Sequence, residues 1–148
     1  MYSKCYVVVD IDGTISKVGD RIKCLEQSPK DWNSFYARCG EDLPNEGVLE
    51  LVKVLQLEYK IIFVSGRRES CRWDTKEWLD TYGINNYLGL LLRKDGDYRH
   101  DTIVKLDLLL NFLGSYDEVA FVLEDRSSVV KKWRELGLTC LQVAEGDF

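Results

Sequence analysis

The sequence has little of what several common kinds of site require. Its single histidine, His100, argues against a metal site built on histidine. Its five cysteines are odd in number and scattered without a C-x-x-C pair, which favours reduced thiols in a cytosol over a disulfide framework or a zinc site. No apolar run approaches the roughly 20 residues that a membrane helix needs, and Met1 to Lys4 does not resemble a signal peptide. These absences predict a cytoplasmic protein that does not enter a membrane.

Charge and length set further limits. A formal net charge of −5 argues against broad, non-specific coating of nucleic acid, although it is compatible with a local basic site around a phosphate. The length of 148 residues suits one domain with a substantial core. We see no repeat, low-complexity segment or linker, so we expect a single domain over residues 1–148 with a short insertion at about 16–45. The sequence leaves the oligomeric state open.

The stretch around which the chain is organised is residues 6–15, Tyr-Val-Val-Val-Asp-Ile-Asp-Gly-Thr-Ile. Its apolar, β-branched start is typical of a strand buried on both faces, as in a parallel sheet covered by helices. Alternation places Asp10 and Asp12 on the same side of the chain as it leaves the sheet, and Gly13 permits a sharp turn. Two carboxylates held together repel each other unless a cation or a shared proton relieves them. The pair therefore predicts a divalent metal at the end of this strand.

Strand-like and helix-like segments alternate along the rest of the chain. We expect further strands over residues 59–64, 88–92, 118–123 and 139–143, and helices over 47–57, 71–82, 101–113 and 127–136, with a short helix over 30–39 inside the insertion. This alternation predicts an α/β fold: a doubly wound, Rossmann-like, mainly parallel sheet with helices on both faces and a small cap or none. Asp101 is the expected N-cap of its helix. His100 is expected to be an exposed loop residue without a partner.

Polar residues end several of the expected strands. Asp10 and Asp12 end the first, Ser65-Gly66-Arg67 the second and Glu124-Asp125 the fourth, while Lys105 lies about a turn into the helix after the third. In a parallel sheet these ends share one edge, so residues distant in sequence converge there. The set contains a nucleophile, an acid, a hydroxyl donor, a cation and metal-binding carboxylates. Those are the groups needed for phosphoryl transfer, where catalysis is mainly positioning and charge neutralisation.

In this order, these motifs resemble those of the haloacid dehalogenase superfamily of phosphohydrolases. The chain is more closely similar to the 3′-phosphatase domain of bacteriophage polynucleotide kinase, over nearly its whole length and most weakly from residue 20 to 44. The closer likeness is carried by Arg21, by residues 93–101 leading into Lys105, by the helix after Glu124-Asp125 and by residues 142–148. No kinase half accompanies it, because G-x-x-x-x-G-K-[ST] is absent. The likeness extends the cytoplasmic expectation to a phage-encoded protein acting in its host's cytoplasm.

The resemblance implies a mechanism and a cofactor. Asp10 would attack phosphorus and form an aspartyl-phosphate, while Asp12 would protonate the leaving oxygen and then deprotonate the hydrolytic water. Mg²⁺ would be held by Asp10, the main-chain carbonyl of Asp12, Asp125 and, through water, Glu124. Glu124 is a departure, since the phage domain has an aspartate at this position. The longer side chain is used by other members of the superfamily.

The resemblance also implies how the substrate is held. Ser65 and the main chain of Gly66 would bind phosphoryl oxygens, and Lys105 would offset charge on nucleophile and phosphate. Three arginines would contact the substrate: Arg21, Arg67 and Arg93. Asp101 would orient Lys105 or one of these arginines. The expected ligand is a 3′-phosphorylated nucleic-acid end or nucleotide. The insertion diverges from the family and would line the entrance, so substrate identity stays open.

Other interpretations of the same residues remain. Taken singly, the aspartate pair could form a hydrogen-bonded turn, Lys105 a solvated face, Glu124-Asp125 a helix cap and the arginines surface charge. On the same machinery the protein could be a small-molecule phosphatase, such as a nucleotidase or a sugar-phosphate phosphatase. A non-enzymatic phospho-acceptor domain is a third reading. Asp12 argues against it, because a second carboxylate in acid–base position shortens the life of an acyl-phosphate.

Overall fold

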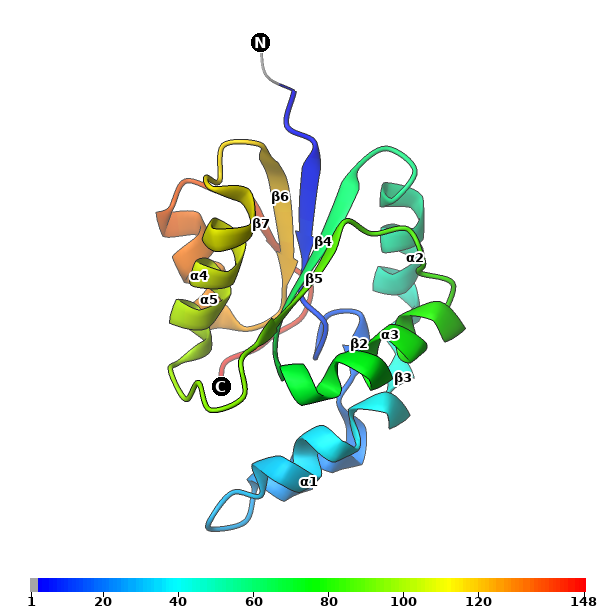
Figure 1. The fold of residues 1–148 in the computed structure, drawn as a ribbon, viewed down its shortest axis with the longest axis vertical. Coiled ribbons are helices and arrows are strands. Elements are labelled where there is room, and N and C mark those ends of the chain that lie inside the picture. Colours follow the sequence, from blue (N-terminus) through cyan, green and yellow to red (C-terminus); the bar gives the residue numbers. More distant parts are fainter. Residues whose placement is uncertain (1–2) are drawn as a thin grey trace.

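The computed structural model describes residues 3–148, which contain a five-stranded parallel sheet. The strand order is β5 (Gly89–Arg93), β4 (Lys60–Arg68), β1 (Tyr6–Val9), β6 (Val119–Glu124) and β7 (Cys140–Gln142). The first strand of the chain lies at the centre, where its three valines are buried on both faces of the sheet. All strands run in the same direction, so their carboxyl ends share the lower edge of the sheet in Figure 1.

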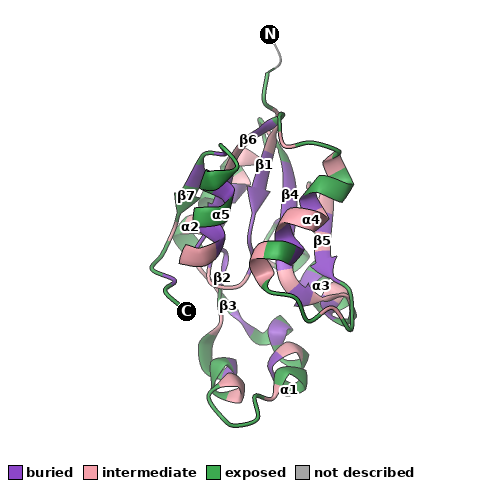
Figure 2. Ribbon diagram, turned by 90° about the vertical axis from the view of Figure 1, so that its left-hand side faces the viewer, coloured by how far each residue is buried: buried purple, intermediate pink, exposed green. Residues whose placement is uncertain are grey.

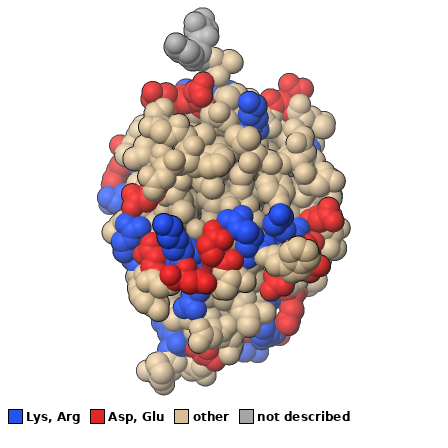
Figure 3. All heavy atoms as spheres, in the orientation of Figure 1, with Lys and Arg blue, Asp and Glu red and all other residues tan. Residues whose placement is uncertain are grey.

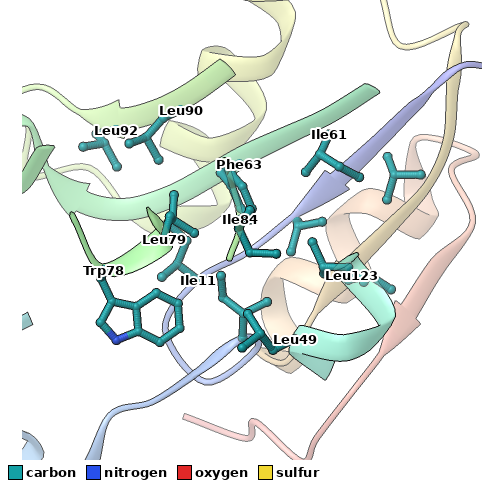
Figure 4. Packing of buried hydrophobic residues seen from close by; sticks show 14 residues of the cluster. Ile11, Leu49, Ile61, Phe63, Trp78, Leu79, Ile84, Leu90, Leu92 and Leu123 are labelled. Carbon is teal, nitrogen blue, oxygen red and sulfur yellow. The ribbon is translucent and has the colours of Figure 1, made fainter. Parts of the chain in front are cut away.

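Helices cover both faces of this sheet, which confirms the predicted α/β fold. One face carries α2 (Glu46–Leu55) and α3 (Arg72–Thr81), and the other carries α4 (Asp101–Leu113) and α5 (Ser127–Glu135) (Figure 1). Alternate residues of β1 supply the two cores: Val7 and Val9 belong to the cluster under α2 and α3, drawn in Figure 4, and Val8 to the cluster under α4 and α5. None of the helices in the described residues is long and apolar enough to cross a membrane.

The insertion forms a small lobe next to the carboxyl edge of the sheet (Figure 2). It begins with β2 (Ser16–Lys17), which pairs antiparallel with β3 (Leu43–Pro44), and between them lie the 3₁₀ helix η1 (Gly19–Leu25), α1 (Trp32–Ala37) and the 3₁₀ turn η2 (Cys39–Glu41). The predicted helix over 30–39 is thus present in a shorter form. The two-stranded ladder and η1 were not predicted, because two-residue strands and 3₁₀ turns leave no hydrophobic period to read.

The N-terminus of α4 corrects one prediction. His100, not Asp101, is its N-cap: the Nδ1 atom of His100 accepts a hydrogen bond from the Thr102 amide at 3.2 Å. The imidazole thus serves one of the amides that the first helical turn leaves without a partner. Asp101 is the first residue of the helix, and its carboxylate is thereby left for the arginines described below.

Candidate active site

Two strand ends and one helix bring four charged side chains together at the carboxyl edge. Asp10 follows β1, Glu124 ends β6 with Asp125 directly after it, and Lys105 projects from the second turn of α4. The Nζ of Lys105 donates to Asp10 Oδ1 and to Glu124 Oε2, both at 2.8 Å. All four residues are at most 5% exposed. The convergence expected of parallel strand ends is therefore present, and we call these four residues the acidic cluster.

The acidic cluster holds more negative charge than it neutralises internally. One ligand oxygen from each of Asp10, Glu124 and Asp125 lies within 4.8 Å of the others, while Lys105 is the one cation that bonds to them among the described residues. Burial, with the charge of Glu124 adding to it, raises the pKa of Asp10 to about 7. Burial and the charge of Asp10 likewise raise the pKa of Asp125 to about 7. A divalent cation that prefers oxygen ligands, such as Mg²⁺, fits this donor set and would relieve the repulsion.

The Gly13-Thr14 pair explains why the aspartates are followed by these two residue types. Gly13 has a positive φ of 83°, and a Cβ there would lie 2.1 Å from Asp125 Oδ2. Only a residue without a side chain lets the turn approach the carboxylate so closely. The hydroxyl of Thr14 donates to Asp10 Oδ2 at 2.8 Å and lies 3.4 Å from Asp125 Oδ1. The turn therefore fixes the second oxygen of Asp10 while Lys105 holds the first.

The chain after β7 supports the loop that carries Asp125. The carbonyl oxygen of Asp125 accepts a hydrogen bond from Gln142 Nε2 at 2.9 Å, and a Cβ on Gly146 would lie 2.2 Å from that same oxygen. The Nε of Arg126 donates to the carbonyl of Phe148 at 3.0 Å. Residues 142–148 thus pack directly over the backbone of a candidate metal ligand.

Asp12 lies in a second group of buried charges, which we call the arginine clamp: Asp12, Arg21, Asp42 and Arg67. Arg21 Nη2 donates to Asp12 Oδ1 and to Asp42 Oδ2, both at 2.6 Å. Arg67 Nη2 donates to the same Asp12 oxygen at 2.7 Å and to Asp42 Oδ2 at 3.3 Å. Both arginines are at most 2% exposed. Two carboxylates and two guanidinium groups balance each other, as buried charges require.

The clamp leaves one oxygen of Asp12 uncommitted. All of the arginine bonds go to Oδ1, and within residues 3–148 no hydrogen bond reaches Oδ2. Burial by itself would raise the pKa of Asp12. The positive charges of Arg67 and Arg21 outweigh this effect and lower the pKa to about 2. The side chain is 22% exposed, in contrast to the arginines behind it. Asp12 is thus a fixed, ionised carboxylate, and its second oxygen has no hydrogen-bond partner among the described residues.

The end of β4 supplies groups suited to phosphate. Ser65 Oγ accepts from the Arg67 amide at 3.1 Å, which leaves its own O–H to donate. The carbonyl of Gly66 accepts from Tyr36 Oη at 3.1 Å and from Arg93 Nε at 3.2 Å. These bonds fix the peptide that follows Gly66. A hydroxyl and an oriented backbone are the kind of donors that bind phosphoryl oxygens.

Asp101 lies against Gly66 at the end of β4. A Cβ on Gly66 would lie 2.7 Å from its Oδ1, so glycine is needed for this approach. Its carboxylate is bonded by Arg93 and, at 2.9 Å, by Arg126 Nη1. Burial by itself would raise the pKa of Asp101. The positive charges of Lys105, Arg93 and Arg126 outweigh this effect and hold the pKa below its usual value. Asp101 therefore organises arginines, one of the two tasks expected of it.

The predicted site residues divide between these groups. Asp12 is not a member of the carboxylate trio, so only its main-chain carbonyl stays a predicted metal ligand. Arg21, Arg67 and Arg93 are at most 9% exposed and bond to protein groups, and their contact with substrate stays a prediction. Three contributors were not found from the sequence: Thr14, Asp42 and Arg126. For Asp42 the signal is only indirect, because the sequence does not reveal that two arginines are buried and need a carboxylate.

The surface over this edge is charged with both signs. Figure 3 shows Lys and Arg side chains interspersed with Asp and Glu in a band across the lower half of the molecule, at the level of the strand ends in Figure 1. A mixed band fits contact with a short, charged ligand better than a long polyanion footprint.

Comparison with known proteins gives three kinds of match. The family model described as the polynucleotide kinase PNKP phosphatase domain matches residues 4–148. A protein of Autographa californica nuclear polyhedrosis virus described as a bifunctional polynucleotide kinase/RNA ligase is 30% identical over 133 residues, which are 88% of this chain and 18% of the viral one. A chain in the solved Pnkp1/Rnl/Hen1 RNA repair complex is 36% identical, with a TM-score of 0.84 over 99% of this chain and 44% of that one.

A more distant structure shows the fold alone. A haloacid dehalogenase-like hydrolase from Streptococcus pneumoniae is 16% identical, with a TM-score of 0.64 over 96% of this chain and 85% of its own. Against the first two relatives, the chain spans less than half of the other protein. The match is therefore to one segment of each.

Proposed function

The chain belongs to the family of polynucleotide kinase phosphatase domains, and on that premise we propose that it removes the terminal phosphate from 3′ ends of polynucleotides through an aspartyl-phosphate on Asp10. One observation carries the proposal. Asp10 is held at one oxygen by Lys105 and at the other by Thr14, beside two further carboxylates and two residues before the clamped Asp12. A nucleophile, a proton carrier and a metal-binding set thus meet at one sheet edge.

The first half-reaction uses Asp10 and Asp12. An oxygen of Asp10 attacks phosphorus, and the bond from phosphorus to the 3′ oxygen breaks as Asp12 Oδ2 gives that oxygen a proton. This step requires a protonated Asp12, whose pKa is about 2 without substrate. The negative charge of a bound phosphate acts in the required direction, because a like charge raises the pKa of a carboxyl.

The second half-reaction reverses the proton's direction. Asp12, now ionised and held at Oδ1 by two arginines, takes a proton from water, and that water attacks the phosphorus of the aspartyl-phosphate. The bond between phosphorus and the Asp10 oxygen breaks, which regenerates the Asp10 carboxylate and frees inorganic phosphate. Mg²⁺ bound by Asp10, Asp125, the Asp12 carbonyl and, through water, Glu124 would neutralise phosphoryl charge. Lys105 and the Ser65 hydroxyl contribute in the same way from the protein.

The test is a substrate panel at equal concentration in Mg²⁺: 3′-phosphorylated RNA and DNA oligonucleotides, 3′-mononucleotides and 5′-mononucleotides. We expect the oligonucleotides to have the highest kcat/KM, and the RNA and DNA arms to assign the polymer. Equal or better turnover of 5′-mononucleotides would overturn the polynucleotide assignment and favour a small-molecule phosphatase.

The covalent intermediate has its own test. Asp12→Asn can neither protonate the leaving oxygen nor activate water, so labelled phosphate from a substrate with a good leaving group should accumulate on Asp10. Normal turnover by this variant would remove the role assigned to Asp12. Conversely, a long-lived phosphoprotein formed by the unaltered chain with acetyl phosphate would indicate a phospho-acceptor domain instead of a hydrolase.

A further inference from the structure

Two stacked rings with a cation against each form a group that we call the α1 ladder, from the insertion and β4: Lys30, Trp32, Tyr36 and Arg68. The rings of Trp32 and Tyr36 are stacked, with centroids 5.9 Å apart and planes 22° apart. The Lys30 ammonium lies 5.8 Å from the centroid of Trp32, and the Arg68 guanidinium 5.0 Å from that of Tyr36. The two rings lie on one side of α1 because they are four residues apart.

The ladder is attached to the candidate active site through two contacts. Tyr36 Oη donates to the carbonyl of Gly66, next to the phosphate-binding Ser65. Beneath the ladder, Phe35 is buried and meets Trp32 and Tyr36 edge-on, at 5.9 Å and 5.2 Å between ring centroids. The other neighbour of Phe35 is the guanidinium of Arg21, 4.3 Å from its centroid, which belongs to the clamp on Asp12. Trp32 and Tyr36 are therefore linked through Phe35 and Arg21 to Asp12, the proposed proton carrier.

Part of the ladder is exposed, and its two cations lie over rings instead of pairing with carboxylates among the described residues. Trp32 is 39% exposed and lies one turn, about 5.4 Å along the helix axis, beyond Tyr36. Neither Lys30 nor Arg68 forms an ion pair with a carboxylate within residues 3–148, and Arg68 donates only to the amide oxygen of Asn33. The nearby Asp31 carboxylate is occupied as the N-cap of α1, where it accepts from Ser34 N at 3.0 Å. What distinguishes Trp32 from the more exposed Trp73 is therefore its setting, a stacked second ring and two cations that pair with no carboxylate among the described residues.

We propose that the α1 ladder binds the nucleotides that precede the phosphorylated end of a single strand. A base would take the place of the Lys30 ammonium over the Trp32 ring, and backbone phosphates would pair with Lys30 and Arg68. The inference rests on the proposed function, since it places the terminal phosphate at Ser65 and Gly66. Stacking on aromatic rings holds any base, and neighbouring cations hold the backbone, so the contact serves ends of any sequence. It also lets an acidic chain bind a polyanion through a small local patch.

The first experiment compares Trp32→Ala with the unaltered chain on a 3′-phosphorylated tetranucleotide and on p-nitrophenyl phosphate. We expect kcat/KM for the tetranucleotide to fall about tenfold or more, mostly through KM, and turnover of p-nitrophenyl phosphate to stay unchanged. Trp32→Phe keeps a stacking face and should retain most of the activity. The matched control is Trp73→Ala, which removes a 70% exposed tryptophan of α3 that is not part of the ladder. It should leave both substrates unaffected.

The second experiment separates stacking from structural support. A tetranucleotide with abasic residues upstream of its phosphorylated end offers nothing to stack, so the unaltered chain should lose as much kcat/KM on it as Trp32→Ala loses on the intact strand. Trp32→Ala should show no further loss on the abasic strand.

Failure of the inference and failure of the proposed function give different results. Equal losses for Trp32→Ala on both substrates, or no loss on the tetranucleotide, would overturn the ladder while leaving the phosphatase assignment intact. If the unaltered chain does not release phosphate from any 3′-phosphorylated oligonucleotide, the proposed function fails and the ladder with it.

Discussion

The acidic cluster and the arginine clamp are both buried groups of four charged side chains that begin at neighbouring aspartates, yet they are built differently. In the acidic cluster three carboxylates share one lysine, and the pKa values of Asp10 and Asp125 rise to about 7. In the clamp two carboxylates meet two arginines, and the pKa of Asp12 falls to about 2. The cluster therefore carries an excess of negative charge, whereas in the clamp the charges balance.

The difference in charge balance suits the two groups to different tasks: the acidic cluster to binding a cation, and the clamp to holding its own side chains in place. An unbalanced group binds a missing charge strongly because the protein has already met the cost of bringing like charges together during folding. A balanced group gains nothing from an added ion and instead fixes the position of its members. In the proposed mechanism this difference would let Asp10 react beside a metal while Asp12 moves a proton from a fixed position.

Removing the nucleophile should have the largest effect. Asp10→Asn is expected to lower kcat by about 10⁴-fold or more, because an amide cannot form the acyl-phosphate. Folding should be retained, since Lys105 keeps Glu124 as its partner. Steady-state turnover with the best substrate of the panel, together with thermal unfolding, measures both. Substantial residual turnover would place the nucleophile elsewhere.

Removing one acid from the clamp should cost mainly stability. Asp42→Ala leaves two buried guanidinium groups with one carboxylate, which we expect to lower the free energy of unfolding by about 3–5 kcal/mol. Urea unfolding without metal is the measurement. The control is Glu41→Gln, which removes the adjacent, exposed carboxylate that pairs with Arg38 and should change little. Similar effects of the two substitutions would show that the clamp is not a unit.

Metal binding should distinguish the two groups directly. At a Mg²⁺ concentration 100 times its Kd, the chain should gain about 2.7 kcal/mol of stability, which chelation with EDTA removes. Asp125→Asn should abolish most of this gain, while Asp42→Asn should keep it despite its lower starting stability. Calcium-free thermal unfolding with and without Mg²⁺ tests both variants. A gain unaffected by Asp125→Asn would move the metal away from the acidic cluster.

The smallest expected effect concerns Thr14. Thr14→Val keeps the shape but removes the hydroxyl that donates to Asp10, so we expect a loss of about 1 kcal/mol in stability and about tenfold in kcat. Thr14→Ser retains the hydroxyl and should recover most of the activity. If Ser and Val behave alike, the hydroxyl has no role in holding the nucleophile.

Where a residue lay at a strand end, its place in the site followed from the sequence. The carboxyl ends of parallel strands meet by construction, so Asp10, Glu124 and Asp125 could be brought together before any coordinates. The predicted helix over residues 101–113 is also present as α4, and Gly114 follows it with a positive φ.

The remainder depends on long-range packing that leaves no local pattern. Asp42 sits in an irregular polar segment, and its role is set by two arginines that come from η1 and β4. The exposure of Trp32 could not be told from the burial of Phe35 three residues later, because both are aromatic residues in a six-residue helix too short to show a clear face. The choice of His100 over Asp101 as cap was decided by the arginines that claim the aspartate.

The packing of residues 142–148 over the Asp125 loop has a practical consequence for anyone handling this chain. Because Gly146 leaves no space for a side chain against the Asp125 carbonyl, residues 142–148 hold the backbone of this candidate metal ligand in place. Removal of the residues after 143, or an affinity tag fused next to Phe148, is therefore expected to make the position of the Asp125 side chain less well defined. The resulting fall in metal affinity could be mistaken for weak intrinsic catalysis.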